Sequence, residues 1–377
     1  MSFYRQMLVV AVVAIALPCG LAAWMYPYFV LTVVAVVIVV HCRKKKNRLT
    51  TLGSARWAGS EDLRRAGMLD ADSGLILGRV TDSPQRAGPA IKALFDRQID
   101  DETACKEFLA MFRQPEQKLV RLPNAVHTAV FAPTGVGKGV SFVIPFLQTC
   151  PDSCVVVDVK GELASLTGTH REKVFGHEVR ILDPYKVVTQ TPDTFNPLDF
   201  IKRESPLAID ACFDLANAFV IRTGQERDPH FPDSAEALIA GLCSMVVQFA
   251  EPGDDRSLQA VRTLLSNPKK LEAAIALMQG SDAWGGMLRR IGGQLAHFKD
   301  KELSSVLTTT NRFLRFLDTI AVAENTRTSS FDPARLRNGK MTVYLVLPPE
   351  HLRAQAALMR MWIGAMLRAV VEGGLQQ

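Results

Sequence analysis

Paired cysteines are absent from this sequence of 377 residues, which has seven cysteines and no CxxC spacing. That absence excludes a disulfide framework and the usual zinc sites, so we expect reduced thiols that face the membrane or the cytoplasm. Positive charge is scarce outside one cluster, because Arg43–Lys46 and Arg48 supply five of the net +6 and leave only +1 for all other residues. The overall charge therefore does not indicate nucleic-acid binding.

Long apolar runs are confined to the start of the chain, where Met7–Trp24 and Tyr28–Cys42 are joined near Met25-Tyr26-Pro27. A full bilayer crossing needs about 20 residues, so each run is a short span. The basic cluster after Cys42 suits the cytoplasmic side, and the aromatic residues at the junction suit a membrane interface. We predict a transmembrane hairpin over residues 1–46 with both chain ends inside. A cleaved signal peptide and a single span are the alternatives.

The rest of the chain divides by its strand and helix patterns. Residues 47–126 are interpreted as a membrane-proximal linker and the start of a cytoplasmic domain. Residues 127–202 alternate β-branched runs with helical patterns, which predicts the first part of a parallel-sheet nucleotide-binding domain. Residues 203–322 have no convincing strand and predict an all-α insertion, after which residues 323–377 return to the sheet domain.

The individual elements follow from hydrophobic periodicity and β-branched runs. The expected strands are Thr128–Phe131, Cys154–Asp158, Glu178–Leu182 and Met341–Leu347. The expected helices are Lys138–Thr149, Glu162–Lys173, Ser234–Phe249, Leu258–Leu265, Leu271–Gln279 and Arg353–Val371. The simplest fold class is therefore α/β, a parallel sheet interrupted by an all-α domain.

A glycine-rich loop, Ala132–Gly139, lies between an expected strand and an expected helix. This is the position of a P-loop, in which backbone N–H groups and the helix dipole hold a phosphate. Gly135 and Gly137 let the backbone turn close to the phosphates, and Lys138 would neutralise charge between the β- and γ-phosphates of ATP. The predicted nucleotide-binding residues are Thr134, Gly135, Val136, Gly137, Lys138, Gly139 and Val140.

Two positions of this loop depart from the P-loop pattern. Ala132 stands where the first glycine is usual, and Gly139 stands where a serine or threonine normally ligates Mg²⁺. Mg²⁺ would therefore be held differently or through water. Ser141 is two residues further along the helix, so we expect its hydroxyl to point another way.

Acidic residues end the expected strand Cys154–Asp158. Ligands bind outside the carboxyl ends of parallel strands, so Asp158 could hold Mg²⁺ or its water, and Glu162 could orient a nucleophile. Alternatively, Asp158 caps the helix that starts near Gly161. A second acidic motif, an apolar strand that ends in Asp-Glu, is not found after Met341.

With these residues assembled, the chain resembles the TraG/VirD-type coupling proteins of type IV secretion and conjugation. The resemblance covers nearly the whole chain, and in that family a glycine after the P-loop lysine is a common variant. The motifs that carry it, in order, are Thr51–Ala58 with Gly74–Gly78, Ala132–Pro145, Asp158–Leu163 (DVKGEL), Leu182–Pro184 (LDP), Phe195–Asp199 (FNPLD), Ser304–Val306 and Tyr344–Pro349 (YLVLPP).

The resemblance implies a RecA-like ATPase anchored in the bacterial inner membrane, with ATP and Mg²⁺ as cofactors and Lys138, Asp158 and Glu162 as catalytic residues. It also implies a homo-hexameric ring that recruits relaxase-bound single-stranded DNA or protein effectors to the inner-membrane components of a secretion channel. Because family members continue to an Asp-Glu strand, we interpret this chain as C-terminally truncated.

The sequence leaves three functional alternatives open. The chain could be an ATP-hydrolysing motor, a non-hydrolysing membrane receptor or relic, or another membrane-anchored DNA translocase. The FNPLD motif and the helical insertion disfavour the third. Arginines of the helical insertion could contact a nucleic acid, but a solvated helix face explains them equally well; these are Arg289, Arg290, Arg312 and Arg315.

Overall fold

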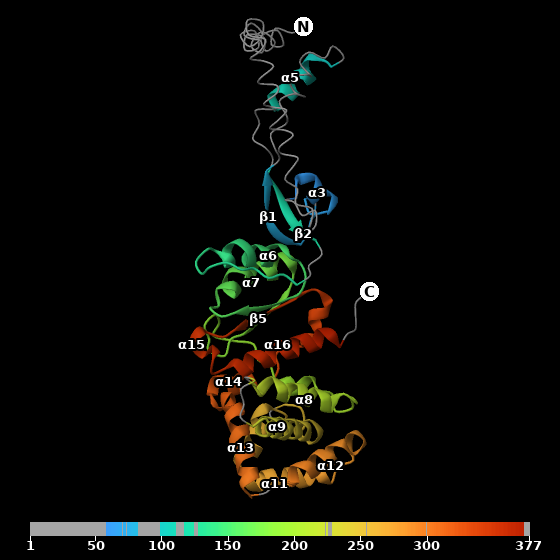
Figure 1. The fold of residues 1–377 in the computed structure, drawn as a ribbon, viewed down its shortest axis with the longest axis vertical. Coiled ribbons are helices and arrows are strands. Elements are labelled where there is room, and N and C mark those ends of the chain that lie inside the picture. The colour runs from blue at the N-terminus through green and yellow to red at the C-terminus, as the bar shows by residue number, and fades with distance from the viewer. Residues whose placement is uncertain are drawn as a thin grey trace, which may run out of the picture. The chain divides into compact units, whose positions relative to one another are not determined.

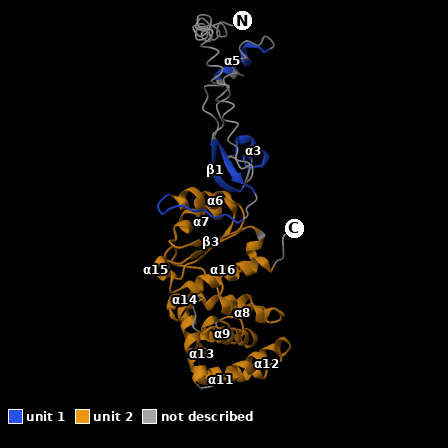
Figure 2. Ribbon diagram, in the orientation of Figure 1, with its two compact units in different colours: residues 1–136 blue, residues 137–377 orange. Residues whose placement is uncertain are grey.

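The structure of the chain is a computed structural model (Figure 1). It describes residues 58–372, apart from residues 70, 73, 82–98, 111–116, 124–126, 223, 225–227, 254 and 299. The predicted transmembrane hairpin lies outside these residues. Within them, no helix has the length and apolar character of a membrane span. The chain separates into two compact units, residues 1–136 and residues 137–377 (Figure 2).

The first unit contains a small antiparallel sheet. Strand β1 (Leu75–Thr81) pairs with β2 (Gln117–Leu122). Two helices, α3 (Ser60–Arg65) and α5 (Asp101–Ala110), complete its described elements. Gly74 immediately precedes β1 at φ 107°, and a Cβ there would lie 2.3 Å from the Leu122 carbonyl oxygen. Only glycine fits this close approach of two backbones, which fixes where the pairing of β1 with β2 starts.

The second unit is built on a parallel sheet whose strand order is β3-β5-β4. The strands are β3 (Cys154–Asp158), β4 (Glu178–Leu182) and β5 (Met341–Val346), so the prediction of three parallel strands at these positions is confirmed. The central strand β5 is buried along its whole length, as a two-sided parallel strand must be.

Helices cover both faces of this sheet (Figure 1). On one face lie α7 (Glu162–Phe175) and α6 (Ile144–Thr149), which packs Leu147 against Val156 and Tyr344. On the other face, α16 (Ala356–Val371) contributes the fully buried Trp362 to a core that continues into the helical insertion. A short helix, α15 (Pro349–Leu352), joins β5 to α16.

The predicted helix after the glycine loop is confirmed, with a change of pitch inside it. Gly139–Val143 forms a π-helical turn in which the N–H of Ile144 donates to the Gly139 carbonyl oxygen, and α6 follows directly. Pro145 lies in the first turn of α6. Because proline has no N–H and crowds the preceding turn of an α-helix, the wider π turn accommodates it.

Between β4 and β5 the described chain contains helices and no strand, as predicted. The helices pack around α9, whose side chains are largely buried from Pro232 to Val247. Their bounds are α8 (Ala208–Phe219), α9 (His230–Phe249), α10 (Leu258–Ser266), α11 (Pro268–Gln279), α12 (Ala283–Ala296), α13 (Asp300–Leu314) and α14 (Ile320–Asn325), with 3₁₀ turns η2 (Pro197–Phe200), η3 (Arg315–Asp318) and η4 (Pro333–Asn338).

The segment through which the chain enters the helical insertion lies beside the segment through which it returns to the sheet. The Phe195 N–H donates to the Asn325 carbonyl oxygen at 2.8 Å, and the Ser330 N–H donates to Thr194 at 3.0 Å. The fully buried Asn196 side chain accepts from the Leu198 N–H and donates to the Arg256 carbonyl oxygen. The FNPLD motif therefore holds together the two crossings of the insertion, the segments through which the chain enters the helices and returns to the sheet.

One predicted element is wrong. Thr128–Phe131 was expected to be a buried strand, but residues 127–133 have no regular structure, and Phe131 is 94% exposed. A strand exists only where a neighbour takes up its backbone hydrogen bonds, and no described strand pairs with this segment. Four apolar or β-branched residues cannot specify such a neighbour on their own.

The buried side chain of Arg171, on α7, ties the elements of this sheet unit together. Its guanidinium donates to the carbonyl oxygens of Leu147 (2.6 Å), Cys150 (2.9 Å) and Asp152 (2.6 Å), and to the Thr342 hydroxyl (2.6 Å). One side chain thus caps the C-terminal end of α6, holds the start of β3 and reaches β5. A cation at a helix C-terminus is also favoured by the helix dipole.

We predict that Arg171→Met lowers the free energy of unfolding by about 3 kcal/mol or more, because it leaves several buried acceptors unpaired. Denaturant titration of the detergent-solubilised chain would measure the loss. Lys173→Met is the matched control, since Lys173 is an exposed residue of the same helix. Equal stability of the two variants would contradict the assigned role of Arg171.

Candidate functional site

The predicted phosphate loop contains the boundary between the two compact units, which falls between Val136 and Gly137. In the first half Thr134 and Val136 are exposed, and Gly135 has φ 85°. In the second half Gly137 has φ 84° and its carbonyl oxygen accepts from the Ser141 N–H at 2.8 Å. Both glycines therefore have the left-handed backbone that the sequence required of them.

The helix after the loop begins with exposed residues. Lys138, Gly139 and Val140 are all accessible to solvent. The first N–H groups of a helix have no acceptor within it, so a helix start that is open in this way offers donors to an anion. The donor set, with Lys138, has the chemistry that a polyphosphate needs.

Ser141 lies one turn beyond Gly137. Its hydroxyl oxygen lies 3.4 Å from where a Cβ on Gly137 would stand, so the side chain faces the loop glycine. Residues four apart lie on the same face of a helix, so this contact follows from ordinary helical spacing. The direction of the Ser141 hydroxyl relative to Gly139 stays a prediction.

Asp158 ends β3, and its side chain is only 3% exposed. Its Oδ2 accepts the backbone N–H of Ala164, in the first turn of α7, at 2.8 Å. The capping role considered for Asp158 is therefore present in the structure, and its role toward Mg²⁺ stays a prediction. Glu162 is the first residue of α7 and is exposed, so it is free of the core.

Two family motifs, DVKGEL and LDP, hold each other in place, which sequence reasoning missed. Gly161 has φ 74°, and a Cβ there would lie 2.5 Å from a methyl carbon of Val188. The segment with Val188 is held by the fully buried Asp183 carboxylate, which accepts the N–H groups of Val187, Val188 and Thr189. The loop after β4 thereby fixes the N-terminus of α7 beside Asp158.

No group of three or more His, Cys, Asp or Glu side chains that could hold a metal ion occurs among the described residues. Mg²⁺ bound to nucleotides commonly uses one or two carboxylates, with the phosphates and water completing its shell. A single carboxylate at the end of β3 fits that arrangement, whereas an all-protein metal site does not.

Two thiols lie close together, one at Cys150 after α6 and one at Cys154, the first residue of β3. Cys150 follows the last residue of α6, and its thiol contacts both Cys154 and the Asp152 carboxylate. The hydrogen bond from the Cys154 thiol lowers the pKa of Cys150 to about 7, and the same bond raises the pKa of Cys154. The spacing of the two cysteines in the sequence could not predict this pair of thiols, because their contact depends on the turn between α6 and β3.

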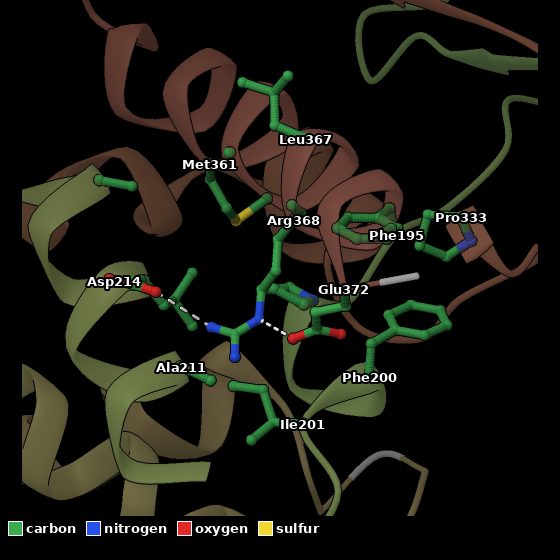
Figure 3. Close-up of a pocket in the computed structure, with 16 residues that line it drawn as sticks. Phe195, Phe200, Ile201, Ala211, Asp214, Pro333, Met361, Leu367, Arg368 and Glu372 are labelled. Atoms are coloured by element: carbon green, nitrogen blue, oxygen red, sulfur yellow. Dashed lines mark hydrogen bonds and ion pairs between the residues drawn. The ribbon is translucent and has the colours of Figure 1, made fainter. Parts of the chain in front are cut away.

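A separate cavity of about 340 Å³ lies between α8, η2 and α16 (Figure 3). Its wall is mainly apolar, and the Arg368 guanidinium in it is neutralised by Asp214 at 3.2 Å and Glu372 at 2.6 Å. None of the predicted site residues lines it. The cavity therefore belongs to the packing of α16 on the insertion and not to the phosphate loop.

The parallel sheet covered by helices, with a carboxylate at the end of β3, defines an α/β protein. Its glycine loop leads into a helix as a P-loop does, but no paired strand precedes it among the described residues. Comparison with known families identifies the family to which this α/β protein belongs. The family described as type IV secretory system conjugative DNA transfer matches residues 56–373. The chain belongs to this family.

Individual relatives agree with that assignment. The chain is 27% identical over 347 residues to a conjugal transfer protein TraG of Escherichia coli, which covers 90% of this chain and 52% of TraG. It is 26% identical over 254 residues to the coupling protein VirD4 of Bartonella quintana, covering 66% and 39%. The chain thus spans about half or less of the length of these relatives.

Among solved structures, the coupling protein TrwB matches with a TM-score of 0.47 and 14% identity, covering 64% of this chain and 50% of TrwB. A TrwB structure in complex with ADP and Mg²⁺ matches with a TM-score of 0.44.

The two roles of Asp158 can be separated by substitution. Asp158→Ala removes the cap and should lower the free energy of unfolding by about 1 kcal/mol. Asp158→Asn keeps an oxygen for the Ala164 N–H, so it should restore most of that stability while weakening Mg²⁺-dependent ATP binding. Denaturation and titration with a fluorescent ATP analogue measure the two effects. If Asp158→Asn bound ATP with unchanged Mg²⁺ dependence, Asp158 would be a cap only.

The lowered pKa of Cys150 predicts its reactivity. Only the thiolate is alkylated, so the rate of iodoacetamide labelling should rise with pH around a midpoint of about 7. An ordinary cysteine has its midpoint near pH ~8.5. Mass spectrometry of the Cys150 peptide from the folded chain gives the profile. In Cys154→Ser, where the hydroxyl is a different donor, the midpoint should shift; an ordinary midpoint in the parent chain would refute the thiol pair.

Proposed function

We propose that this chain is the ATP-binding part of a membrane-anchored coupling protein for type IV secretion or conjugation. The observation that carries the proposal is the family match, which runs without interruption through the loop, the sheet and the helical insertion. In this proposal residues 127–202 and 323–377 form a RecA-like nucleotide-binding domain, and residues 203–322 form the insertion. The hairpin 1–46 anchors the chain in the bacterial inner membrane.

ATP is proposed to bind at Thr134–Val140. The exposed helix start at Lys138–Val140 supplies N–H donors, and the Lys138 ammonium supplies the positive charge. Bound Mg²⁺ would neutralise phosphate charge, with Asp158 or a water on it as the ligand and Ser141 as a further oxygen. Glu162, exposed at the start of α7, is proposed to orient a nucleophile. TrwB, to which the chain is similar, binds ADP with Mg²⁺.

The proposed partners follow from the family. They are the inner-membrane components of a secretion channel, relaxase-bound single-stranded DNA or protein effectors, and further copies of the chain in a homo-hexamer. A second candidate function is a receptor that binds ATP without hydrolysing it. One observation favours this second function: the Asp158 carboxylate already caps α7, and the described residues gather no larger acidic group around it.

Lys138→Ala tests the first part of this proposal. We expect ATP affinity to fall tenfold or more, because a charge-assisted hydrogen bond contributes about 1.5–3 kcal/mol. The measurement is displacement of a fluorescent ATP analogue from the detergent-solubilised chain. Lys269→Ala is the control, since Lys269 is an exposed lysine of α11. Unchanged affinity in Lys138→Ala would refute ATP binding at this loop.

Hydrolysis separates the two candidate functions. Phosphate release that is present in the parent chain and absent in Lys138→Ala would establish the motor. ATP binding without any phosphate release, by the chain alone and with its secretion partners, would establish the receptor.

A further inference from the structure

The turn between α6 and β3 brings two cysteine side chains together. Cys150 directly follows α6, and Cys154 is the first residue of β3. The Cys150 sulfur lies 3.7 Å from the Asp152 carboxylate, and the Cys154 sulfur lies 3.5 Å from the Asp152 carbonyl oxygen. The Cys154 thiol also forms a hydrogen bond with Cys150. The two sulfur atoms therefore meet across a turn of three residues.

Contacts from outside this turn fix its backbone. The Arg171 guanidinium donates to the carbonyl oxygens of Cys150 at 2.9 Å and Asp152 at 2.6 Å. Nε2 of His177, the residue before β4, donates to the Pro151 carbonyl oxygen at 2.8 Å. Both side chains that provide these bonds are buried. The fold therefore positions the two sulfur atoms, and the unfolded chain has nothing equivalent to hold them together.

This environment favours a thiolate at Cys150. The hydrogen bond from Cys154, with a smaller contribution from the Arg171 charge, lowers the pKa of Cys150 to about 7. About half of the Cys150 side chains are therefore thiolate near neutral pH, and the thiolate is the form that attacks an electrophile. The same hydrogen bond raises the pKa of Cys154, which keeps its proton while Cys150 is ionised. The pair thus combines a nucleophile with a second thiol beside it.

The turn is open to a small reagent. Pro151 and Asp152 are exposed, Cys154 is partly exposed, and Cys150 is 7% exposed. Hydrogen peroxide is little larger than water, so it can reach sulfur atoms that a bulky reagent cannot. Reactive cysteines are typically found in such partly accessible positions beside a cation, which here is Arg171.

The helical insertion contains two further thiols whose environment is the opposite. Cys212 on α8 and Cys243 on α9 are both fully buried. Burial raises the pKa of Cys212 to about 11. Burial, and then the neighbouring Cys212, raises the pKa of Cys243 well above its usual value. These two thiols lie near each other without being reactive, so they serve as an internal control for the pair in the turn.

We propose that Cys150 and Cys154 form an oxidation site, which a small hydroperoxide converts into a disulfide. The Cys150 thiolate attacks one peroxide oxygen, the O–O bond breaks, and the other oxygen leaves as hydroxide. The sulfur is oxidised by two electrons to a sulfenic acid, and the peroxide is reduced by two. The Cys154 sulfur then attacks the Cys150 sulfur: the S–S bond forms, the S–O bond breaks, and the hydroxide leaves with the Cys154 proton as water.

Loss of the thiolate makes the second step possible. The hydrogen bond to Cys150 is what raises the pKa of Cys154, and a sulfenic acid carries no such charge. Cys154 can then ionise and attack. A dithiol reductant reverses the reaction by thiol–disulfide exchange, which returns both thiols. The bridge joins the end of α6 to the start of β3, and its formation does not require ATP at the phosphate loop.

The test treats the whole chain, in detergent micelles near neutral pH, with a small molar excess of hydrogen peroxide. Remaining thiols are alkylated in denaturant, and the chain is digested with trypsin without reduction. Trypsin releases both cysteines in one peptide, Gly139–Lys160, because no lysine or arginine lies between these ends. We expect mass spectrometry to show this peptide without alkyl groups and with two hydrogen atoms fewer. Dithiothreitol should restore two thiols that can be alkylated, and the peptides of Cys212 and Cys243 should stay reduced.

The pH profile shows whether the fold determines this reactivity. In the folded chain the rate of bridge formation should rise with pH around a midpoint of about 7. In guanidinium chloride the turn is lost, so the midpoint should return to the ordinary cysteine value of ~8.5.

Three variants assign the roles of the two thiols. Cys154→Ser removes the second thiol, so Cys150 should stop at the sulfenic acid, which dimedone traps. Cys150→Ser should give neither a bridge nor a dimedone adduct in this peptide near neutral pH, because the ionised thiol is gone. Cys212→Ser is the matched control and should form the bridge as the parent chain does.

A reversible bridge in the parent chain, with its pH midpoint near neutrality, supports the proposal. The proposal is overturned if Gly139–Lys160 keeps two free thiols under conditions that oxidise free glutathione, or if Cys150 becomes a sulfinic acid without any bridge. It is also overturned if the folded and denatured chains show the same midpoint, since short spacing alone would then explain the reaction. The parent chain decides these outcomes, so a variant that fails to fold does not affect them.

Discussion

The buried guanidinium of Arg171 is the interaction on which the sheet unit depends. Four acceptors from α6, the turn before β3 and β5 converge on it. The helix that starts at the phosphate loop is therefore fixed at its far end, by a residue of the next helix. Arg171 therefore links α6, which follows the loop, to α7, whose first turn Asp158 caps.

Much of the sheet could be predicted because its strands are short β-branched runs with clear ends. Cys154–Asp158 and Glu178–Leu182 have the bounds that the sequence predicted. Helix starts were less accurate: α9 begins at His230, earlier than expected, because Pro232 in its first turn hides the pattern. The prediction of a strand at Thr128–Phe131 was wrong because a strand is defined by its neighbour, and four residues contain no information about that neighbour.

The residues of the candidate site also divide into those that the sequence could predict and those that it could not. Residues close in sequence, such as Gly135, Gly137 and Lys138, could be predicted from spacing. Contacts between distant segments could not be predicted: the packing of Gly161 on Val188 depends on the order of the strands.

The hydrogen bonds between residues 193–196 and residues 325–330 determine how this unit unfolds. Both crossings of the insertion are hydrogen-bonded to each other, and one apolar core runs from Val343 of the sheet through Trp362 of α16 to Leu238 of α9. The helices cannot separate from the sheet at one crossing alone. The other crossing is hydrogen-bonded to it, and the shared apolar core would have to open as well. Residues 137–377 should therefore melt as one cooperative body, in which the helices move with the sheet instead of swinging on a loose tether.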